Sequence, residues 1–296
     1  MKLTIQHVTH YEYSAPLQYA LQSLCLTPQA SAHQTVHDWT LSAPAPLFAQ
    51  RDGYGNLAHT WSLVRRTYGN AVRAGGTVET HASPWLVDDS VPPQLYLRNT
   101  PLTETDDRLK ALGRAHLGDG VDEAAAMALA VAVLNRVRYK SGATTVQTTA
   151  LEAWALGGGV CQDHAHVFIA ACRANGVPAR YVSGYFYAPG APHLASHAWA
   201  DICIDAAEHR WLSIDITHGC LMDERHVRLA VGLDYAACSP IRGIREGGGD
   251  ESMRVRIDIR EALAASLVNP ISVRAAPVEA FRQTQSQRSG KSSLEP

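Results

Sequence analysis

Three consecutive glycines at positions 157–159 stand just before Cys161, and they constrain the fold more than any other feature of the chain. Glycine frees the backbone for unusual torsions and close approach, so this run predicts a tight connection. A helix is expected directly afterwards, because apolar residues recur at intervals of three and four, at Ala165, Phe168, Ile169 and Cys172. Asn175-Gly176, followed by Pro178, is typical of a helix end. The pattern therefore places Cys161 at the N-terminus of a helix.

This position suits a thiol that acts as a nucleophile. Amides at a helix N-terminus stabilise a thiolate, and so does an adjacent imidazolium. The backbone N–H of Cys161 is a candidate donor for an oxyanion hole, and the glycines keep the approach to the thiol open. A single cysteine is more often a small buried hydrophobe, so its interpretation as a nucleophile depends on partner side chains.

His197 and Asp215 are the candidate partners. His197 opens an alternating segment that reads as a strand to Ile204, and Asp215 ends a second strand that begins at Trp211. If these strands form an antiparallel hairpin with its turn near residues 206–207, the two side chains come nearly opposite each other, with Cβ atoms roughly 4.5–5.5 Å apart. A carboxylate there would orient the imidazole and fix its tautomer. A packed histidine and a strand-end cap are the ordinary explanations of each residue alone, but the order thiol, histidine, carboxylate favours a triad.

The rest of the chain predicts an α+β protein. Residues 1–100 read as a β-rich N-terminal domain of short strands. Residues 101–275 read as a catalytic domain, in which helices expected at 122–138 and 149–156 precede the strands of an antiparallel sheet. Residues 276–296 are polar and lack apolar periodicity, which is typical of a disordered tail.

Composition excludes several classes of function. Lys plus Arg number 26 and Asp plus Glu number 28, so the net charge of −2 gives no reason to expect binding to nucleic acid or an anionic membrane. The longest apolar stretch, 124–134, is far shorter than the roughly 20 residues that span a bilayer. The N-terminus alternates like a strand and lacks a secretory pattern, so a cytoplasmic location is expected. Six scattered cysteines fit reduced thiols.

A metal site is a second interpretation of the histidines near the thiol. His164 and His166 follow Cys161, and His218 and Cys220 come later in the chain. Positions two apart on a helix point about 200° apart, so His164 and His166 do not easily face one ion. The chain also lacks the acidic loop pattern of an EF-hand. We therefore expect neither a metal nor a cofactor.

Four further side chains have two open interpretations each. Trp199, Tyr185 and Tyr187 are either walls of a substrate groove or packing elements of the sheet, and aromatic residues on strands are more often the latter. Arg180 either pairs with a carboxylate or binds substrate. We therefore leave all four out of the predicted catalytic set.

Motifs along the chain resemble the bacterial transglutaminase-like cysteine peptidase family. The segment 158–166 reads Gly-Gly-Val-Cys-Gln-Asp-His-Ala-His, and the other matching segments of the second half are 176–185, 196–199, 212–217, 232–235 and Gly243. Segments 7–13, 26–28 and 52–56 are similar to the β-rich N-terminal domain of the same family. Two positions depart from the family pattern: His164 stands where an aromatic residue is common, and Asp201 stands where glutamate is common.

The resemblance implies a papain-like α+β catalytic domain with Cys161 as nucleophile, His197 as base and Asp215 as the residue that orients it. It implies acyl transfer through an acyl-thioester, with a peptide or protein as substrate. We favour hydrolysis, as by a peptidase or amidase. The alternatives are transamidation of glutamine side chains and a catalytically silent module that binds peptides.

Overall fold

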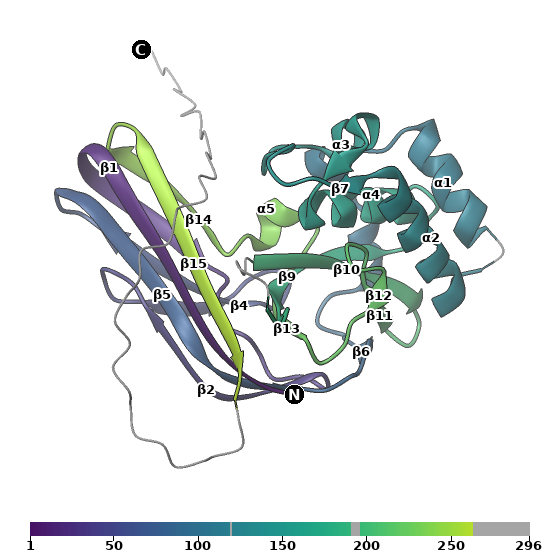
Figure 1. Ribbon diagram of the computed structural model, residues 1–296, viewed down its shortest axis with the longest axis horizontal. Coiled ribbons are helices and arrows are strands. Elements are labelled where there is room, and N and C mark those ends of the chain that lie inside the picture. The colour runs from purple at the N-terminus through teal and green to yellow at the C-terminus, as the bar shows by residue number, and fades with distance from the viewer. Residues whose placement is uncertain (119, 191–195, 263–296) are drawn as a thin grey trace.

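The computed structural model describes residues 1–118, 120–190 and 196–262, and Figure 1 shows a β-sheet on one side and a helical layer on the other. The N-terminal sheet has seven strands, in the order β2-β5-β1-β4-β3 with β14 and β15 also paired to β1. Their bounds are β1 Lys2–Leu24, β2 Gln34–Ser42, β3 Phe48–Arg51, β4 Leu57–Leu63, β5 Thr67–Thr80, β14 Ile241–Gly247 and β15 Glu251–Glu261.

Strand β1 is the axis of this sheet. Instead of the short strands expected from the sequence, it runs for 23 residues, and every second side chain from Leu3 to Tyr13 is buried. It pairs antiparallel with β15 from Leu3↔Glu261 onward and with β14 as far as Leu24↔Ile241. The chain therefore returns to its first strand within residues 241–261, which the sequence had grouped with the catalytic domain.

The second half of the chain forms an antiparallel sheet covered by helices. Its strand order is β12-β11-β10-β9-β13, with β6 paired to β11. The strands are β6 Trp85–Val87, β9 Ala179–Phe186, β10 Ser196–Asp205, β11 Arg210–Asp215, β12 Cys220–Leu221 and β13 His226–Gly232, and a separate parallel pair joins β7 Arg138–Tyr139 to β8 Gly158–Gly159. The helices are α1 Asp107–Leu117, α2 Glu123–Arg136, α3 Ala150–Leu156, α4 Cys161–Arg173 and α5 Tyr235–Cys238, with 3-10 turns Pro93–Leu97 and Pro101–Thr103. The α+β class expected from the sequence is confirmed.

Helix α4 lies at the centre of this half. Every residue from Gln162 to Arg173 is buried, whereas Cys161 at its start is half-buried. The helix packs on β9 and β10 in a core that also contains the buried faces of α1, α2 and α3. The helix expected after the glycine run is thus buried along nearly its whole length, and its first residue alone is partly exposed.

The two halves share a buried boundary. Tyr185, Val227 and Leu229 from β9 and β13 pack into the apolar core of the N-terminal sheet. The Tyr185 hydroxyl lies 2.8 Å from His7 Nδ1 on β1, so the boundary also contains polar contacts. Within the described ranges, no helix is long and apolar enough to cross a membrane. The expected tail 276–296 lies outside the described residues.

Candidate active site

The connection into α4 explains two of the three glycines. Gly157 closes α3 in the left-handed conformation, with φ +67°. Gly159 has no room for a side chain, because a Cβ there would lie 2.6 Å from Asp163 Oδ2. That oxygen accepts hydrogen bonds from the Val160 amide and the Thr144 hydroxyl, both at 2.7 Å. The side chain of Asp163 thereby fixes the turn that presents Cys161 at the start of α4.

His197 and Asp215 are in direct contact. His197 Nε2 lies 2.7 Å from Asp215 Oδ2, and both side chains are buried. They do not stand directly opposite, as the expected hairpin required, because Ala200 pairs with Ile214 and the register is shifted by two residues. A four-residue turn at 206–209 and an irregularity after Cys203 cause this shift. An even shift keeps both side chains on one face, so the predicted contact survives.

Cys161 completes the predicted trio. Burial lowers the pKa of His197, but hydrogen bonds and charge from Asp215 and then from Cys161 outweigh it and raise this pKa to about 10. Since the His197 Nε2 atom is occupied by Asp215, the Nδ1 atom is the ring nitrogen left to face the thiol. The three side chains singled out in the sequence therefore meet at one point between α4, β10 and β11.

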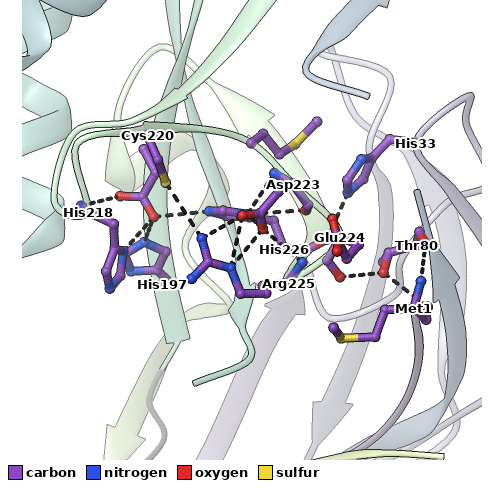
Figure 2. Close-up of polar contacts among 12 residues, drawn as sticks. Met1, His33, Thr80, His197, His218, Cys220, Asp223, Glu224, Arg225 and His226 are labelled. Carbon is purple, nitrogen blue, oxygen red and sulfur yellow. Dashed lines mark hydrogen bonds and ion pairs between the residues drawn. The ribbon is translucent and has the colours of Figure 1, made fainter. Parts of the chain in front are cut away.

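Asp215 is surrounded by more histidines than the sequence predicted. Figure 2 labels these histidines, His197, His218 and His226. Its Oδ2 atom lies 2.6 Å from His218 Nδ1 and 3.0 Å from His226 Nε2, in addition to His197. Its Oδ1 atom accepts a hydrogen bond from the His218 backbone N–H at 3.1 Å. Burial raises the pKa of Asp215, but these hydrogen bonds and the charge of His197 hold it well below its ordinary value. We call Asp215, His197, His218 and His226 the histidine cluster.

Phe186 packs against the rings of this cluster. Its ring stacks on His218 with centroids 4.1 Å apart, and it lies 5.3 Å from His197 and 4.8 Å from His226. The tight packing restricts the rotamers of all three imidazoles. The sequence offered a signal for His218, which follows Asp215 by three residues across a turn, but none for Phe186 or His226.

Three members of the cluster also have the composition of a metal site. Donor atoms of His197, Asp215 and His226 lie within 4.8 Å of one another. These donors already pair through short contacts to one carboxylate oxygen, so hydrogen bonding accounts for their grouping. His164 and His166 do not join them, because His164 contacts Thr217 and the Val137 carbonyl, whereas His166 Nε2 accepts from the Tyr235 amide.

A second buried carboxylate, Asp201, lies on β10. It accepts from Arg180 Nε at 2.8 Å, from Arg228 Nη2 at 2.7 Å and from the Ser213 hydroxyl at 2.5 Å. Arg180 also binds Asp88 at 2.6 Å and lies over the Trp211 ring at 4.4 Å. Arg180 thus pairs with carboxylates, the first of its two interpretations, and Asp201 belongs to a buried ionic cluster beneath the sheet.

The remaining side chains with two interpretations are packing elements. Trp199 and Tyr185 are fully buried, and Tyr187 packs at the edge of the N-terminal core. The aromatic residue that does reach the surface near the thiol is Tyr139, which is 60% exposed. Burial and then the charge of Cys161 raise its pKa. The sequence reasoning had not singled out Tyr139.

The other five thiols differ from Cys161. All six cysteines are free, and Cys161 and Cys220 alone are more than marginally exposed. Burial raises the pKa of Cys25, Cys203 and Cys220 to about 11, and it also raises the pKa of Cys172 and of Cys238 well above the ordinary value. These five thiols are therefore protonated near neutral pH and unreactive toward electrophiles.

Known proteins resemble both halves of the chain. Residues 3–79 match the bacterial transglutaminase-like N-terminal region, and residues 111–216 match the transglutaminase-like superfamily. Uncharacterized proteins of Mycobacterium tuberculosis and Mycobacterium bovis are 30% identical over 300 residues, covering 86% of this chain and 91% of theirs. A solved structure from Cytophaga hutchinsonii, described as "a Putative Cysteine Protease", shares the fold with a TM-score of 0.69 at 21% identity, covering 93% of this chain and 94% of its own. The chain belongs to the transglutaminase-like superfamily and carries the bacterial transglutaminase-like N-terminal region.

Proposed function

We propose that the chain is a cysteine hydrolase that cleaves peptide or amide bonds through an acyl-thioester. One observation carries the proposal: a half-buried thiol at a helix start lies close enough to His197 to raise the pKa of its imidazole, and His197 Nε2 contacts Asp215 Oδ2 at 2.7 Å. This is the geometry of a nucleophile, a base and a residue that orients the base. Membership of a superfamily alone would not support it, because a fold hosts many functions.

The reaction begins with the Cys161 thiolate and the His197 imidazolium as an ion pair. The sulfur attacks the carbonyl carbon, a C–S bond forms, and the carbonyl oxygen takes up the negative charge. Amides at the first turn of α4 stabilise that oxyanion. When the intermediate collapses, the C–N bond breaks and the leaving amine takes the proton from His197 Nδ1.

Water completes the cycle. His197 accepts a proton from water, the hydroxide oxygen attacks the thioester carbon, and the acid leaves as the C–S bond breaks. The thiolate is restored, and His197 again carries the proton. Throughout both steps Asp215 holds the Nε2 side of the ring, so Nδ1 stays directed at the reacting atoms.

Two features suit an extended substrate. Tyr139 offers an exposed aromatic face near the thiol. A cleft is lined by Ser196, which precedes His197 in the sequence, by Tyr235 and by side chains of β1, β14 and β15. A peptide bound in this cleft would contact both halves of the protein.

Thiol labelling tests whether the site is active. Iodoacetamide at pH 7 should alkylate Cys161 much faster than the other five cysteines, and His197→Ala should abolish this preference. Cys220→Ala is the matched control, because Cys220 is also half-buried but has a raised pKa. Equal and slow labelling of all six thiols would instead support a module that only binds peptides.

Product analysis separates hydrolysis from transamidation. The protein is incubated with a peptide library, with and without a primary amine, and products are identified by mass spectrometry. Cleaved peptides that disappear with Cys161→Ala would support hydrolysis. Amine adducts without cleavage would support transamidation and overturn the proposed reaction.

A further inference from the structure

His226 is a buried member of the histidine cluster that the proposed chemistry does not use. Its side chain is fully buried, and its Nε2 atom lies 3.0 Å from Asp215 Oδ2. A carboxylate oxygen only accepts hydrogen bonds, so Nε2 must carry the proton in this contact. The Nδ1 atom faces Asp223, whose amide lies at 3.1 Å and whose carboxylate lies at 3.1 Å. Either protonation state of Nδ1 is therefore satisfied, and Nε2 remains a donor to Asp215 in both.

Side chains of the N-terminal domain form hydrogen bonds with the backbone around His226 at every second residue, and we call these hydrogen bonds the grip. The Thr80 hydroxyl donates to the Glu224 carbonyl at 2.5 Å, and His33 Nε2 donates to the His226 carbonyl at 2.8 Å. Gln34 exchanges two hydrogen bonds of 2.9 Å with the backbone of Arg228. All three N-terminal side chains are at most 1% exposed, so water does not compete for these contacts. Figure 2 shows this line of contacts running from Met1 and Thr80 toward His197.

Strand β13 lies at the edge of the catalytic sheet, with β9 as its neighbour. Since an edge strand exposes backbone groups on one side, its position depends on what satisfies them. Here buried side chains of the N-terminal domain satisfy them, and the residue held at the middle of the grip is His226. Among the groups that face its ring are Asp215, Asp223, His197, Trp199 and Phe186.

We propose that His226 is a positioning residue for the triad and that the N-terminal domain, by gripping β13, holds it against Asp215. The inference rests on the proposed function for its catalytic consequence, but its structural part concerns the His197–Asp215 contact alone. His226 donates to Asp215 Oδ2 from one side, and the same oxygen also contacts His218 and His197, so His226 helps to fix the direction of that oxygen toward His197. The N-terminal sheet would thus contribute to the geometry of a site from which it supplies no reacting group.

The first test follows the proton on His197 Nε2 by NMR at low field. In the wild type, this proton should be visible and slow to exchange with solvent. His226→Phe should make it exchange at least ten times faster, and His226→Gln, which keeps a donor, should restore slow exchange. His37→Phe is the matched control, because it removes an exposed histidine 2.8 Å from Glu79 in the N-terminal sheet. Unchanged exchange in folded His226→Phe would overturn the proposal.

The second test measures alkylation of Cys161 by iodoacetamide across pH. Because the hydrogen bond from His226 helps to lower the pKa of Asp215, His226→Phe should move the acid limb of the profile to higher pH. The rate at pH 6 should fall by up to about 100-fold, the loss typical of a misplaced catalytic group. Loss of thermal stability with an unchanged profile would reduce His226 to a structural role. An unreactive Cys161 in the wild type would refute the proposed function, whereas the NMR result would still decide the positioning.

The third test asks whether the hydrogen bonds from the N-terminal domain to β13 act through His226. His33→Leu should weaken alkylation in the same direction as His226→Phe but less, since Thr80 and Gln34 still hold the strand. If His33 acts through His226, the double variant should be no slower than His226→Phe alone. If the losses in alkylation rate of the two single variants added up in the double variant, His33 would affect the site by a route that does not involve His226. Stoichiometric zinc in the purified protein, with the low-field proton absent until the metal is removed, would show that the cluster is a metal site and would also overturn the proposal.

Discussion

Two fully buried carboxylates lie on neighbouring strands of the catalytic sheet, and they are held in different ways. Asp201 on β10 is bound by Arg180 and Arg228, which keep their charge at all physiological pH values. Asp215 on β11 is bound by the imidazole rings of His197, His218 and His226, all of which contact one carboxylate oxygen. Surrounding groups hold the pKa of both carboxylates well below the ordinary value. The difference between them lies in the partners: one carboxylate is bound by guanidinium groups, and the other is bound by imidazole rings, a type of side chain suited to acid–base chemistry.

Asp215→Asn should have the largest effect. The amide cannot hold His197 in the productive tautomer, and a loss of about 10⁴-fold in kcat is typical when a triad aspartate becomes asparagine. The measurement is hydrolysis of a peptide found by the library screen, with unfolding in urea as the control for stability. A loss of less than tenfold in kcat would contradict the proposal that Asp215, unlike Asp201, acts in the reaction.

Asp201→Asn should affect stability instead of chemistry. It leaves Arg228 and Arg180 partly uncompensated in the interior, and breaking a buried ion pair costs about 3–5 kcal/mol. Urea unfolding followed by circular dichroism measures this loss. Asp258→Asn is the control, because its partner Arg260 is 77% exposed and the pair should contribute no more than about 1 kcal/mol. If Asp201→Asn kept full stability but lost activity, the ionic cluster would have a catalytic role.

The two variants should also differ in how their effects depend on pH. The pKa of His197 is raised from 6.5 to about 10, so its contribution is full below pH 6.5 and disappears as pH rises through about 10. The lowered pKa of Asp215 means that its contribution is lost only as pH falls below the ordinary value. The destabilisation by Asp215→Asn should therefore shrink between pH 6.5 and 10, whereas that by Asp201→Asn stays constant. Parallel curves of unfolding free energy against pH would contradict this distinction.

Tyr139→Ala should have the smallest effect on activity. Tyr139 touches neither carboxylate, but its exposed ring lies next to the thiol. Loss of an aromatic contact worth about 0.5–1.5 kcal/mol would raise KM about 2- to 10-fold and leave kcat within a factor of two. Tyr139→Phe should behave as wild type. A fall in kcat with unchanged KM would place the hydroxyl in the chemistry.

The sequence predicts the parts of the site that depend on local patterns. Helical periodicity and the glycine run placed Cys161 at a helix start, and strand parity placed His197 and Asp215 on one face. The exact register was wrong by two residues, because the turn length and an irregularity near Cys203 are not encoded in alternation. A shift of two residues leaves both side chains on the same face of the sheet, so the predicted contact between His197 and Asp215 is still present.

The parts that the sequence missed depend on which strands become neighbours. His226 reaches Asp215 because β13 pairs with β9, which lies beside β10, and no local pattern specifies that order. The Asp201 cluster likewise joins residues from the loop after β6 and from β9, β10 and β13, among them Asp88, Arg180 and Arg228. The return of β14 and β15 to the N-terminal sheet joins residues that are more than 200 positions apart.

That return has a consequence for how the protein is made. Leu3 acquires its partner Glu261 only after almost all of the described chain has been synthesised, so β1 emerges from the ribosome long before β15. Until then β1 can pair with β5 and β4, but its hydrogen-bonding groups opposite β14 and β15 are open to other chains. Contacts of such sequence separation form slowly and leave a window for aggregation. The last two strands of the described residues therefore complete the pairing of the first strand, and the nascent chain stays exposed to misassembly until they have been translated.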